Sequence, residues 1–505
     1  MPDRFHVHTA VTPGRFRRVG KYGAVDWRED CSRCANCVKH RCEYEAYKKE
    51  GVHNRDPLAP LQPLNECKAC LSCVQGCTKG LLAISINPEF LAMGDTYWTP
   101  DLIATTWNQS DTGRIPVSGA GYRGRFYGFG FDSIWTDMSE IVRPTRDGIH
   151  GREYISTSVD VGGKPLRLKF APDGGLITRP ANLIELQFPA ILDVPPWPMN
   201  DATLALARAK TAVAMKTLAV ARPECLAKAP SDQFASLIPL IDGQEEAERW
   251  DSLLSQVRMV ELVDGPGAAA LAKRLGDAHP ALVIAVRVEI RGGAADHVSQ
   301  LAKGGIKVFH LAADLHGCER GVEKPRHLKD TLREIHGRLV TGGVRDEVTL
   351  IAGGGIGAAE HMAKAIICGA DLVAVDTPLL VALGCRVCQG AHTDGKAALP
   401  GETCKGGCTL FSPLRKGDCP LCSAGKGDSP RFHKAGNGCS PLFADSNVSY
   451  AAQRMTNLMG AWHSQLIEVL GAMGMREVRR LRGEVGRAIF MEDMEREAFG
   501  DLIRK

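Results

Sequence analysis

Eight cysteines near the start of the chain form two near-copies of one spacing, C-x2-C-x2-C-x4-C and then C-x2-C-x2-C-x3-C. They are Cys31, Cys34, Cys37 and Cys42, followed by Cys67, Cys70, Cys73 and Cys77. Three thiolates at this close spacing, with a fourth a few residues on, are ligands typical of iron–sulfur clusters. The residues therefore predict two [4Fe–4S] clusters and the transfer of single electrons.

The same arrangement is typical of bacterial two-cluster ferredoxins, in which the fourth cysteine of each set ligates the other cluster. One cluster would then be held by Cys31, Cys34, Cys37 and Cys77, and the other by Cys67, Cys70, Cys73 and Cys42. Two departures from the ferredoxin pattern are the four-residue gap before Cys42 and the lack of the usual proline after Cys42 and Cys77, where Glu43 and Thr78 stand.

Zinc and disulfides are the alternative uses of these cysteines. Zinc sites usually pair two C-x2-C knuckles or mix cysteine with histidine, so the spacing favours clusters. Disulfides require an oxidising compartment. Residues 1–20 are basic but contain no apolar signal-peptide core, so we expect a protein of the reducing cytoplasm.

A second cysteine-rich region, in the last quarter of the chain, is also expected to bind metal. Its seven cysteines are Cys385, Cys388, Cys404, Cys408, Cys419, Cys422 and Cys439. The C-P-L-C pair at 419–422 alone resembles a zinc-ribbon knuckle. Seven thiols are enough for one cluster and one zinc ion, or for two clusters, and the spacing leaves both open.

A glycine-rich loop, A-G-G-G-I-G, follows one apolar run and precedes a helical pattern. Glycines let backbone amides turn toward an anion, and a helix N-terminus attracts phosphate. We predict that Gly353, Gly354 and Gly355 bind the phosphate of FMN, with Asp376 and Thr377 at the end of the next run completing the site. The letters also fit a dinucleotide fingerprint, but that motif belongs to the first strand–helix turn of its unit. A glycine-rich elbow without a ligand is the remaining alternative.

Three charged residues are candidates for contact with the cofactor or substrate. Arg287 ends the strand pattern V-R-V-E, and a cation there would stabilise reduced, anionic flavin. A structural salt bridge is the alternative for Arg287. His316 and Glu319 follow the next strand pattern in a loop dense in acid–base groups and are candidate catalytic residues. Such loops also carry charged residues for solvation alone.

Eight short apolar runs alternate with helical patterns and must position these groups. The expected strands are 186–194, 217–221, 237–241, 258–263, 282–289, 306–312, 348–353 and 371–376. The expected helices are 202–216, 245–256, 267–276, 294–303, 325–339 and 358–369. Strands interleaved with helices indicate a parallel sheet, and eight of them fit an α/β fold with a closed (β/α)8 barrel. An open doubly wound sheet is the rival.

The composition divides the chain into five regions. They are a ferredoxin-like two-cluster domain (1–95), a linker with a few short strands (96–183), the barrel (184–384), a Cys-rich metal or cluster region (385–445) and a helical C-terminal region (446–505). Within the last region, 450–471 has a strong amphipathic helix pattern. The basic stretch 476–487 indicates a solvated helix face, with a contact face for an acidic partner as the alternative.

Charge and hydropathy exclude two classes of function. A net charge of +4 over 505 residues gives no argument for nucleic-acid binding. No apolar run approaches the ~18 residues that a membrane-spanning helix needs. A chain with 18 cysteines and no signal peptide is therefore expected to work with metals or clusters in the cytoplasm.

The stretches 351–356 and D-L-V-A-V-D-T-P-L-L-V-A-L-G-C, which ends at Cys385, resemble the flavin-binding synthase domain of glutamate synthase. The chain is most similar to the short, archaeal-type form, which carries an N-terminal two-cluster ferredoxin segment. The resemblance implies that the three glycines of 353–355 hold the FMN phosphate, and that Arg287 stands where the family usually has a lysine. It also implies an iron–sulfur site that begins with Cys385 and Cys388 and is completed by Cys404 or Cys408.

The departures from this family lie mainly on the substrate side. The family's S-A-M-S-x-G-A loop is replaced by D-V-P-P-W-P-M at 193–199, and its G-G-T-G-type loop by A-D-L-H-G-C-E-R at 313–320. The cluster cysteines are respaced from x5 and x4 to x2 and a long insertion. Residue 2 is Pro, not the catalytic cysteine of a glutaminase, so ammonia from glutamine would need a separate glutaminase subunit.

The sequence therefore predicts an iron–sulfur flavoprotein oxidoreductase that resembles glutamate synthase. Electrons would pass from the N-terminal clusters, by way of the region after Cys385, to FMN in the barrel, for reductive formation of glutamate from 2-oxoglutarate and ammonia or glutamine. The expected partners are an electron-donor protein or NAD(P)H-oxidising subunit, within an oligomer or complex. The alternatives are an electron-transfer subunit without glutamate synthase activity of its own, and a barrel that has lost FMN and serves as a scaffold.

Overall fold

The computed structural model describes most of the chain. The described residues are 5–16, 18–27, 31–32, 34–49, 67–115, 128–137, 154–164, 168–177, 182–196, 202–226, 229–387, 410, 414–415, 433–434, 438–439 and 447–503. Five of the predicted metal ligands lie outside them: Cys388, Cys404, Cys408, Cys419 and Cys422. The side chain of Cys439 also lies outside the description, although its backbone forms part of a short strand.

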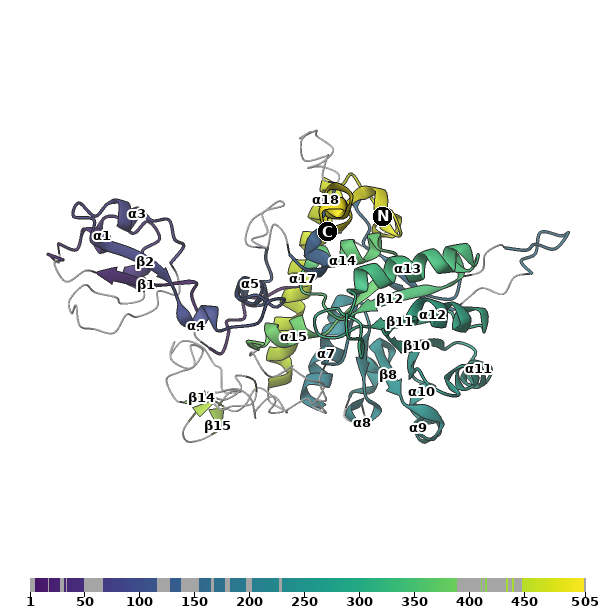
Figure 1. Ribbon diagram of the computed structural model, residues 1–505. Helices are drawn as coiled ribbons and strands as arrows, with labels where there is room; N and C mark the ends of the chain where they lie inside the picture. The colour runs from purple at the N-terminus through teal and green to yellow at the C-terminus, as the bar shows by residue number, and fades with distance from the viewer. Residues whose placement is uncertain are drawn as a thin grey trace.

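Eight parallel strands close into a barrel at the centre of the molecule (Figure 1). They are β6 (Ala190–Leu192), β7 (Ala219–Ala221), β8 (Leu237–Ile241), β9 (Met259–Val263), β10 (Val283–Glu289), β11 (Val308–Ala312), β12 (Thr349–Gly353) and β13 (Leu372–Val375). They follow one another around the barrel in chain order, and β13 pairs with β6 to close it. The predicted (β/α)8 barrel is confirmed, and the open-sheet rival is wrong because no barrel strand is left at an edge.

Helices follow the strands and cover the outside of the barrel, which explains why the strands are apolar on both faces. Every residue of β8, β11, β12 and β13 is buried. The helices are α7 (Ala202–Met215), α8 (Pro223–Leu226), α9 (Gly243–Arg249), α10 (Asp251–Leu254), α11 (Ala268–Ala278), α12 (Ala294–Lys303), α13 (Leu328–Thr341), α14 (Ala359–Ile367) and α15 (Thr377–Ala382). The helix expected at 245–256 is divided at Trp250 into α9 and α10.

The region expected to be a linker, 96–183, contains ordered elements that pack on the barrel. Helix α5 (Pro100–Thr112) begins at the N-cap Thr99, has proline at its first position and ends at Gly113 with φ of 66°. Strand β4 (Val159–Gly162) pairs with β5 (Leu183–Leu186). The Oγ1 of Thr349, at the start of β12, donates to the Gly162 carbonyl at 2.8 Å. The described part of this region therefore contributes to the barrel's packing.

The C-terminal region is built on one long helix, α17 (Val448–Ala472), as the amphipathic pattern predicts. It packs against α5, α7, α14 and α15. Arg454 on its buried face pairs with Asp111 of α5 at 2.6 Å. The basic stretch 476–487 is not the expected helix face, because it forms two short 3-10 turns, η8 (Val478–Leu481) and η9 (Val485–Arg487). Its arginines pair with acids such as Asp160 and Asp346.

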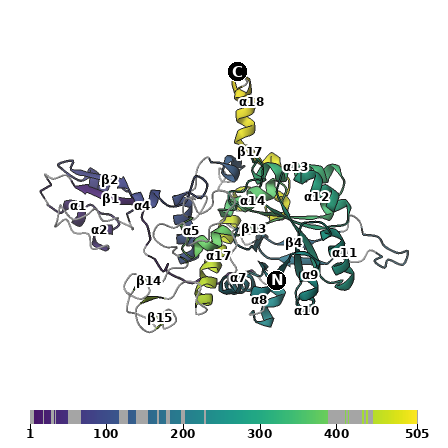
Figure 2. The ribbon, with the colours of Figure 1, turned by 60° about the horizontal axis from the view of Figure 1, so that its bottom comes forward.

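The N-terminal cysteines lie in a small unit beside the barrel body (Figures 1 and 2). An antiparallel pair, β1 (Tyr22–Trp27) and β2 (Leu82–Ile86), joins its two ends. Between them lie the short helices α1 (Asn36–Lys39), α2 (Ala46–Lys49) and α3 (Ser72–Gln75). Helix α4 (Pro88–Leu91) then leads from β2 toward the barrel. The ferredoxin-like assignment of this unit stays a prediction.

The remaining described elements are short, apart from the last helix. They are η1 (Gly130–Ser133), β3 (Ile134–Thr136), η4 (Ser231–Ser236), η5 (Arg345–Glu347), β14 (Leu414–Arg415), β15 (His433–Lys434), β16 (Gly438–Cys439), β17 (Ala488–Phe490) and α18 (Met491–Ile503). Among the described helices, none combines the length and the apolar character needed to cross a membrane.

Candidate functional site

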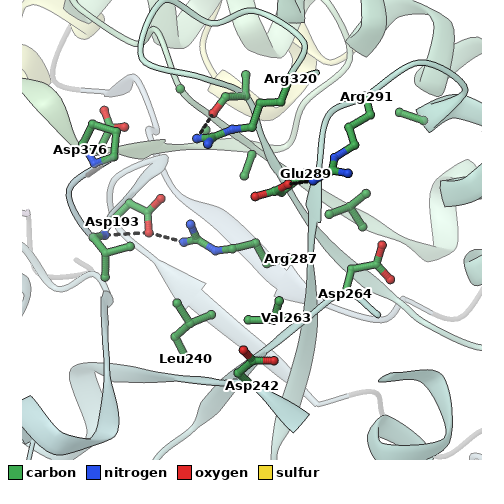
Figure 3. A pocket seen from close by; sticks show the side chains of 18 of the residues that line it. Asp193, Leu240, Asp242, Val263, Asp264, Arg287, Glu289, Arg291, Arg320 and Asp376 are labelled. Carbon is green, nitrogen blue, oxygen red and sulfur yellow. Dashed lines mark hydrogen bonds and ion pairs between the residues drawn. The ribbon is translucent and has the colours of Figure 1, made fainter. Parts of the chain in front are cut away.

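The carboxyl ends of the barrel strands surround a cavity of about 790 Å³. This is the end at which (β/α)8 barrels carry their active sites, and the volume is within the range of ligand pockets. Figure 3 shows Asp193, Arg287, Arg320 and Asp376 around this cavity. These residues come from the ends of different strands, so barrel closure is what brings them together.

Arg287, on β10, lies in the mouth but is held by two carboxylates. Its Nη2 donates to Asp193, which follows β6, and its Nε donates to Glu261 of β9. Burial would lower the pKa of Arg287, but Asp193 and Glu261 outweigh burial and raise it. Two carboxylates against one guanidinium leave surplus negative charge at this point. The arrangement is the structural salt bridge that the sequence left open as the alternative for Arg287.

His310, on β11, extends this network into the barrel core. Its Nδ1 lies 3.0 Å from Glu261 Oε1, and its Nε2 lies 3.6 Å from Asp193 Oδ2. Both His310 and Glu261 are completely buried. Burial would raise the pKa of Glu261, but Arg287 and His310 outweigh it and lower that pKa. Glu261 is therefore the ionised anchor of the network.

Asp376 lies at the opening of α15 and lines the cavity. Its carboxylate accepts the Thr377 N–H at 2.5 Å, so it caps the helix. Burial first of all raises the pKa of Asp376, the hydrogen bond from Thr377 opposes this, and nearby Asp193 adds to the rise, so that the pKa is about 6. Asp376 is therefore a side chain at the cavity that can hold or release a proton near neutral pH.

The glycine loop lies where the sequence predicts, between β12 and α14. A side chain at Gly353 would meet His310 Nε2 at 2.6 Å, and Gly354 has φ of 95°, so glycine is required at both positions. Gly353 and Gly354 line the cavity. Gly355 is instead covered, because the Tyr97 hydroxyl donates to its carbonyl and Gly317 packs against its Cα.

Arg320 is a cavity-lining cation with a buried, unused donor. Its Nη2 donates to the Ala313 carbonyl at 3.1 Å. Its Nε is buried and has no hydrogen-bond acceptor among the residues that the structure describes. A buried guanidinium donor without an acceptor, beside the backbone of Gly353 and Gly354, fits a phosphate group. The residues present at this side of the cavity therefore fit the phosphate of FMN.

The two candidate catalytic residues of the loop after β11 do not line the cavity. His316 lies 2.8 Å from Asp95, and this hydrogen bond raises the pKa of His316. Glu319 is buried and pairs with Arg326 at 2.8 Å. Both therefore have partners that hold the loop in place rather than positions facing the cavity.

In the N-terminal unit the structure brings Cys42 to the cysteines of the second set. The pKa of the Cys67 thiol is raised by burial and also by the nearby thiols of Cys73, Cys42 and Cys70. Burial also raises the pKa of Cys73, with further contributions from Cys70 and Cys42. These four thiols are the set that the sequence predicts for one cluster.

Of the other predicted set, Cys37 is buried, Cys31 and Cys77 are half-buried, and Cys34 is exposed. Cys37 and Cys73 pack in one small core, with Cys42, Cys67 and Cys77 against it. Five cysteines drawn from both sets thus lie in or against one core, and the predicted cross-ligation stays a prediction.

The cysteine region after the barrel begins beside the segment that leaves the N-terminal unit. Cys385 is half-buried and follows α15 closely. Arg386, the next residue, pairs with Glu89 of α4 at 2.8 Å, and its carbonyl accepts the Gly94 N–H at 2.9 Å. The start of the second cysteine region, at Cys385 and Arg386, therefore contacts residues 89–94, which follow the N-terminal cysteine unit.

Sequence reasoning missed the network under the cavity. Glu261 is the single charged residue in the strand M-V-E-L-V, and a buried acid in an apolar strand signals a partner. In the sequence, Asp193 stands out only as the first residue of the loop 193–199, which replaces the family's S-A-M-S-x-G-A loop. Their connection through Arg287 could not be found from spacing, because the three residues come from three different strands.

Comparison with known proteins supports the relationship inferred from the glycine loop. A conserved region in glutamate synthase matches residues 327–406, which include the glycine loop and Cys385. The archaeal-type glutamate synthase [NADPH] of Dehalococcoides mccartyi is 22% identical over 511 residues, which cover 91% of this chain and 93% of that protein. Over most of its length the chain is similar to archaeal-type glutamate synthases.

Two further relatives that are named glutamate synthases are also similar to this chain. The archaeal-type glutamate synthase [NADPH] of Thermotoga maritima is 23% identical over 525 residues, covering 93% of this chain and 95% of that protein. The archaeal glutamate synthase [NADPH] of Methanocaldococcus jannaschii is 30% identical over 165 residues, or 32% of this chain and 26% of that one. The family resemblance predicted from the sequence is confirmed, and the chain is an oxidoreductase of the glutamate synthase type.

Proposed function

We propose that this protein, which is similar to glutamate synthases, passes electrons from two N-terminal [4Fe–4S] clusters, through a metal centre that begins at Cys385, to FMN at the barrel mouth. The proposed product is glutamate, formed from 2-oxoglutarate and ammonia or glutamine. The proposed partners are an electron-donor protein or NAD(P)H-oxidising subunit, and a separate glutaminase subunit where glutamine is the nitrogen source.

The observation that carries this proposal is the contact between the two cysteine regions. Arg386 follows Cys385 directly and is bonded to Glu89 and Gly94, in the segment that leaves the N-terminal unit. The same stretch begins just after α15, whose N-terminus opens on the cavity at Asp376. These contacts of Arg386 with Glu89 and Gly94 support the proposed route from the N-terminal unit toward the barrel.

The residues that would hold FMN are Gly353, Gly354 and Arg320 at the phosphate. Bound FMN supplies hydride transfer to an imine, which in this family derives from 2-oxoglutarate and ammonia. The chain itself supplies a proton at the Asp376 carboxyl, whose pKa is raised to about 6 by burial first of all. The pairing of Arg287 with Asp193 fixes both side chains in the cavity wall.

An anaerobic cofactor inventory tests the proposal. Iron, sulfide, zinc and flavin are measured per chain in protein purified without oxygen, and glutamate formation is then assayed with a chemically reduced ferredoxin. We expect clusters, FMN and turnover. Arg320→Ala should lose FMN while the cluster content stays unchanged, whereas Arg291→Ala, which removes a rim arginine paired with Glu289, should keep both. A wild-type protein without iron–sulfur clusters or without FMN contradicts the proposal.

A second candidate function is that of an electron-transfer subunit without turnover of its own. The supporting observation is Asp193, which stands in the replaced family loop and holds Arg287, so the cation expected to act at the flavin is neutralised. Protein that carries clusters and FMN, is reduced by a donor, and forms no glutamate from 2-oxoglutarate and ammonia would select this second function.

A further inference from the structure

The chain between β4 and β5 contains a short β-hairpin, residues 168–177, which we call the arm. Phe170 pairs with Leu176 in antiparallel fashion, and the Ile177 N–H donates to the Lys169 carbonyl at 2.8 Å. Nine of the ten residues of the arm are exposed. Figures 1 and 2 both show the arm at the right, apart from the barrel body. The arm is therefore almost fully open to solvent in the part of the chain that the structure describes.

Three large apolar side chains lie on one face of the arm. Side chains alternate between the two faces of a strand, so Leu168 and Phe170 share a face, and the antiparallel pairing places Leu176 on the same face. These three residues are 56%, 60% and 48% exposed. A two-stranded hairpin alone is marginally stable in water, and a contiguous exposed apolar face marks an interaction site. The apolar face of the arm therefore needs another surface to cover it.

A groove of about 550 Å³ lies at the root of the arm. Gly163, which follows β4, and Asn182, which precedes β5, both line this groove and bracket the arm in the sequence. The groove also has apolar side chains from α11 and from around the starts of β10 and β11, namely Ala269, Ala272, Leu282, Ile284, Ile306 and Val308. The exposed Lys273 stands in the groove wall, and Asp173 stands at the tip of the arm. One chain thus carries an apolar arm and a partly apolar groove side by side.

We propose that the arm of one copy of this chain occupies the groove of a second copy, whose arm returns the contact. Because arm and groove are neighbours on one chain, a two-fold axis beside the arm brings each arm to the other copy's groove and buries both surfaces in one closed interface. The opposite charges of Asp173 and Lys273 favour this pairing. A different protein would have to supply both a groove for the arm and an apolar segment for the groove. This inference does not depend on the clusters or FMN of the proposed function.

Sedimentation velocity of the full-length protein tests this inference, and we expect the wild type to be a dimer. An arm variant, Phe170→Asp with Leu176→Asp, puts charge on the apolar face and should be a monomer. A groove variant, Ala269→Arg, fills the groove from an exposed position and should also be a monomer. The matched controls are Lys169→Ala, on the other face of the arm, and Ala270→Arg, exposed on α11 but outside the groove wall. Both controls should stay dimeric, and every variant should keep the wild-type melting temperature of the barrel.

A mixture of the arm variant and the groove variant isolates the contact between arm and groove. A mixed dimer keeps one intact contact, formed by the unaltered arm of the groove variant and the unaltered groove of the arm variant, so the mixture should contain dimer that neither variant forms alone. A monomeric wild type overturns the inference, as does a dimer that neither variant dissociates. A groove variant that stays dimeric while the arm variant dissociates also overturns it, because the arm would then have another binding surface. All three results leave the proposed electron path standing.

Discussion

The N-terminal cysteine unit and the barrel achieve their compactness in opposite ways. Among the described residues, the core cluster of the cysteine unit consists of Cys37, Tyr47, Cys73 and Leu82, so two of its four members are predicted metal ligands. The barrel instead buries whole strands, such as β11 and β12, among apolar neighbours. The difference predicts that the barrel can fold on its own apolar surface, whereas the cysteine unit would need its proposed metal clusters to stay folded.

Removal of iron should give the largest effect, because it should unfold the cysteine unit and leave the barrel folded. We expect the metal-free protein to lose the cysteine unit while the barrel stays folded, because four buried side chains cannot replace the energy of metal binding. Limited proteolysis under reducing conditions checks this, with new cleavage near Lys39, Lys68 and Lys79 and a protected barrel fragment. Equal protection of both regions in the metal-free protein would refute the comparison.

Loss of one partner of a buried ion pair should lower the unfolding free energy of the barrel strongly. Arg345 pairs with Asp371 at 2.8 Å, and both side chains are almost fully buried. Arg345→Ala leaves Asp371 buried with less compensation, which typically costs about 3–5 kcal/mol of unfolding free energy. The measurement is urea unfolding followed by tryptophan fluorescence. Arg482→Ala removes the more exposed partner of the same carboxylate and should cost only about 1 kcal/mol.

Acid should weaken the barrel through His327. Burial first of all, and then Lys329 and His361, lower the pKa of His327 to about 3, so the folded state holds it neutral. The unfolded chain takes up a proton below about pH 6.5, so this contribution is present above that pH and is lost as the pH falls toward 3. The expected slope is about 1.4 kcal/mol per pH unit.

Thermal unfolding between pH 7 and pH 5 checks the His327 prediction. His327→Asn should flatten the dependence of the barrel melting temperature on pH, because asparagine can still cap α13 but does not titrate. An unchanged slope in this variant would assign the acid sensitivity to other groups. The temperature at a single pH is not the readout, since the substitution also changes packing.

Removal of the ion pair that connects the cysteine unit to the barrel should change the unfolding free energy least. Glu89 and Arg386 form a 2.8 Å ion pair, but the Glu89 side chain is 52% exposed. Glu89→Gln should change the unfolding free energy by less than about 1 kcal/mol, because exposed pairs contribute little. A large loss of stability would mean that the cysteine unit and the barrel unfold together, contrary to the first prediction.

Sequence periodicity was sufficient for the barrel because its signals are local. Each strand is an apolar run and each helix an amphipathic pattern, so all eight strands and the main helices were predicted close to their observed bounds. Helix α5 was missed although Thr99, Pro100 and Gly113 mark its ends, because the surrounding glycine- and aromatic-rich sequence hid these signals. The helix expected within 476–487 is two 3-10 turns, whose arginines pair with acids distant in the sequence.

The candidate site was harder to predict because its contacts are not local. The position of the glycine loop followed from its place after the seventh strand. The pairing of Arg287 with Asp193 and Glu261 depends on three strands meeting in space, which no spacing reveals. His316 and Glu319 were expected near substrate because their loop follows a strand, yet Asp95 and Arg326 hold them elsewhere.

The contact of Tyr97 and Trp98 with the barrel has a consequence for synthesis of the chain. Tyr97 donates to the Gly355 carbonyl, and Trp98 Nε1 donates to the Leu315 carbonyl at 3.0 Å, so the segment after α4 rests on loops made more than two hundred residues later. The ribosome delivers the cysteine unit before the barrel, but the loops that hold the segment after α4 exist only after β12 has emerged. The cysteine unit is therefore translated early relative to the barrel and gains its final position only after the barrel strands are made.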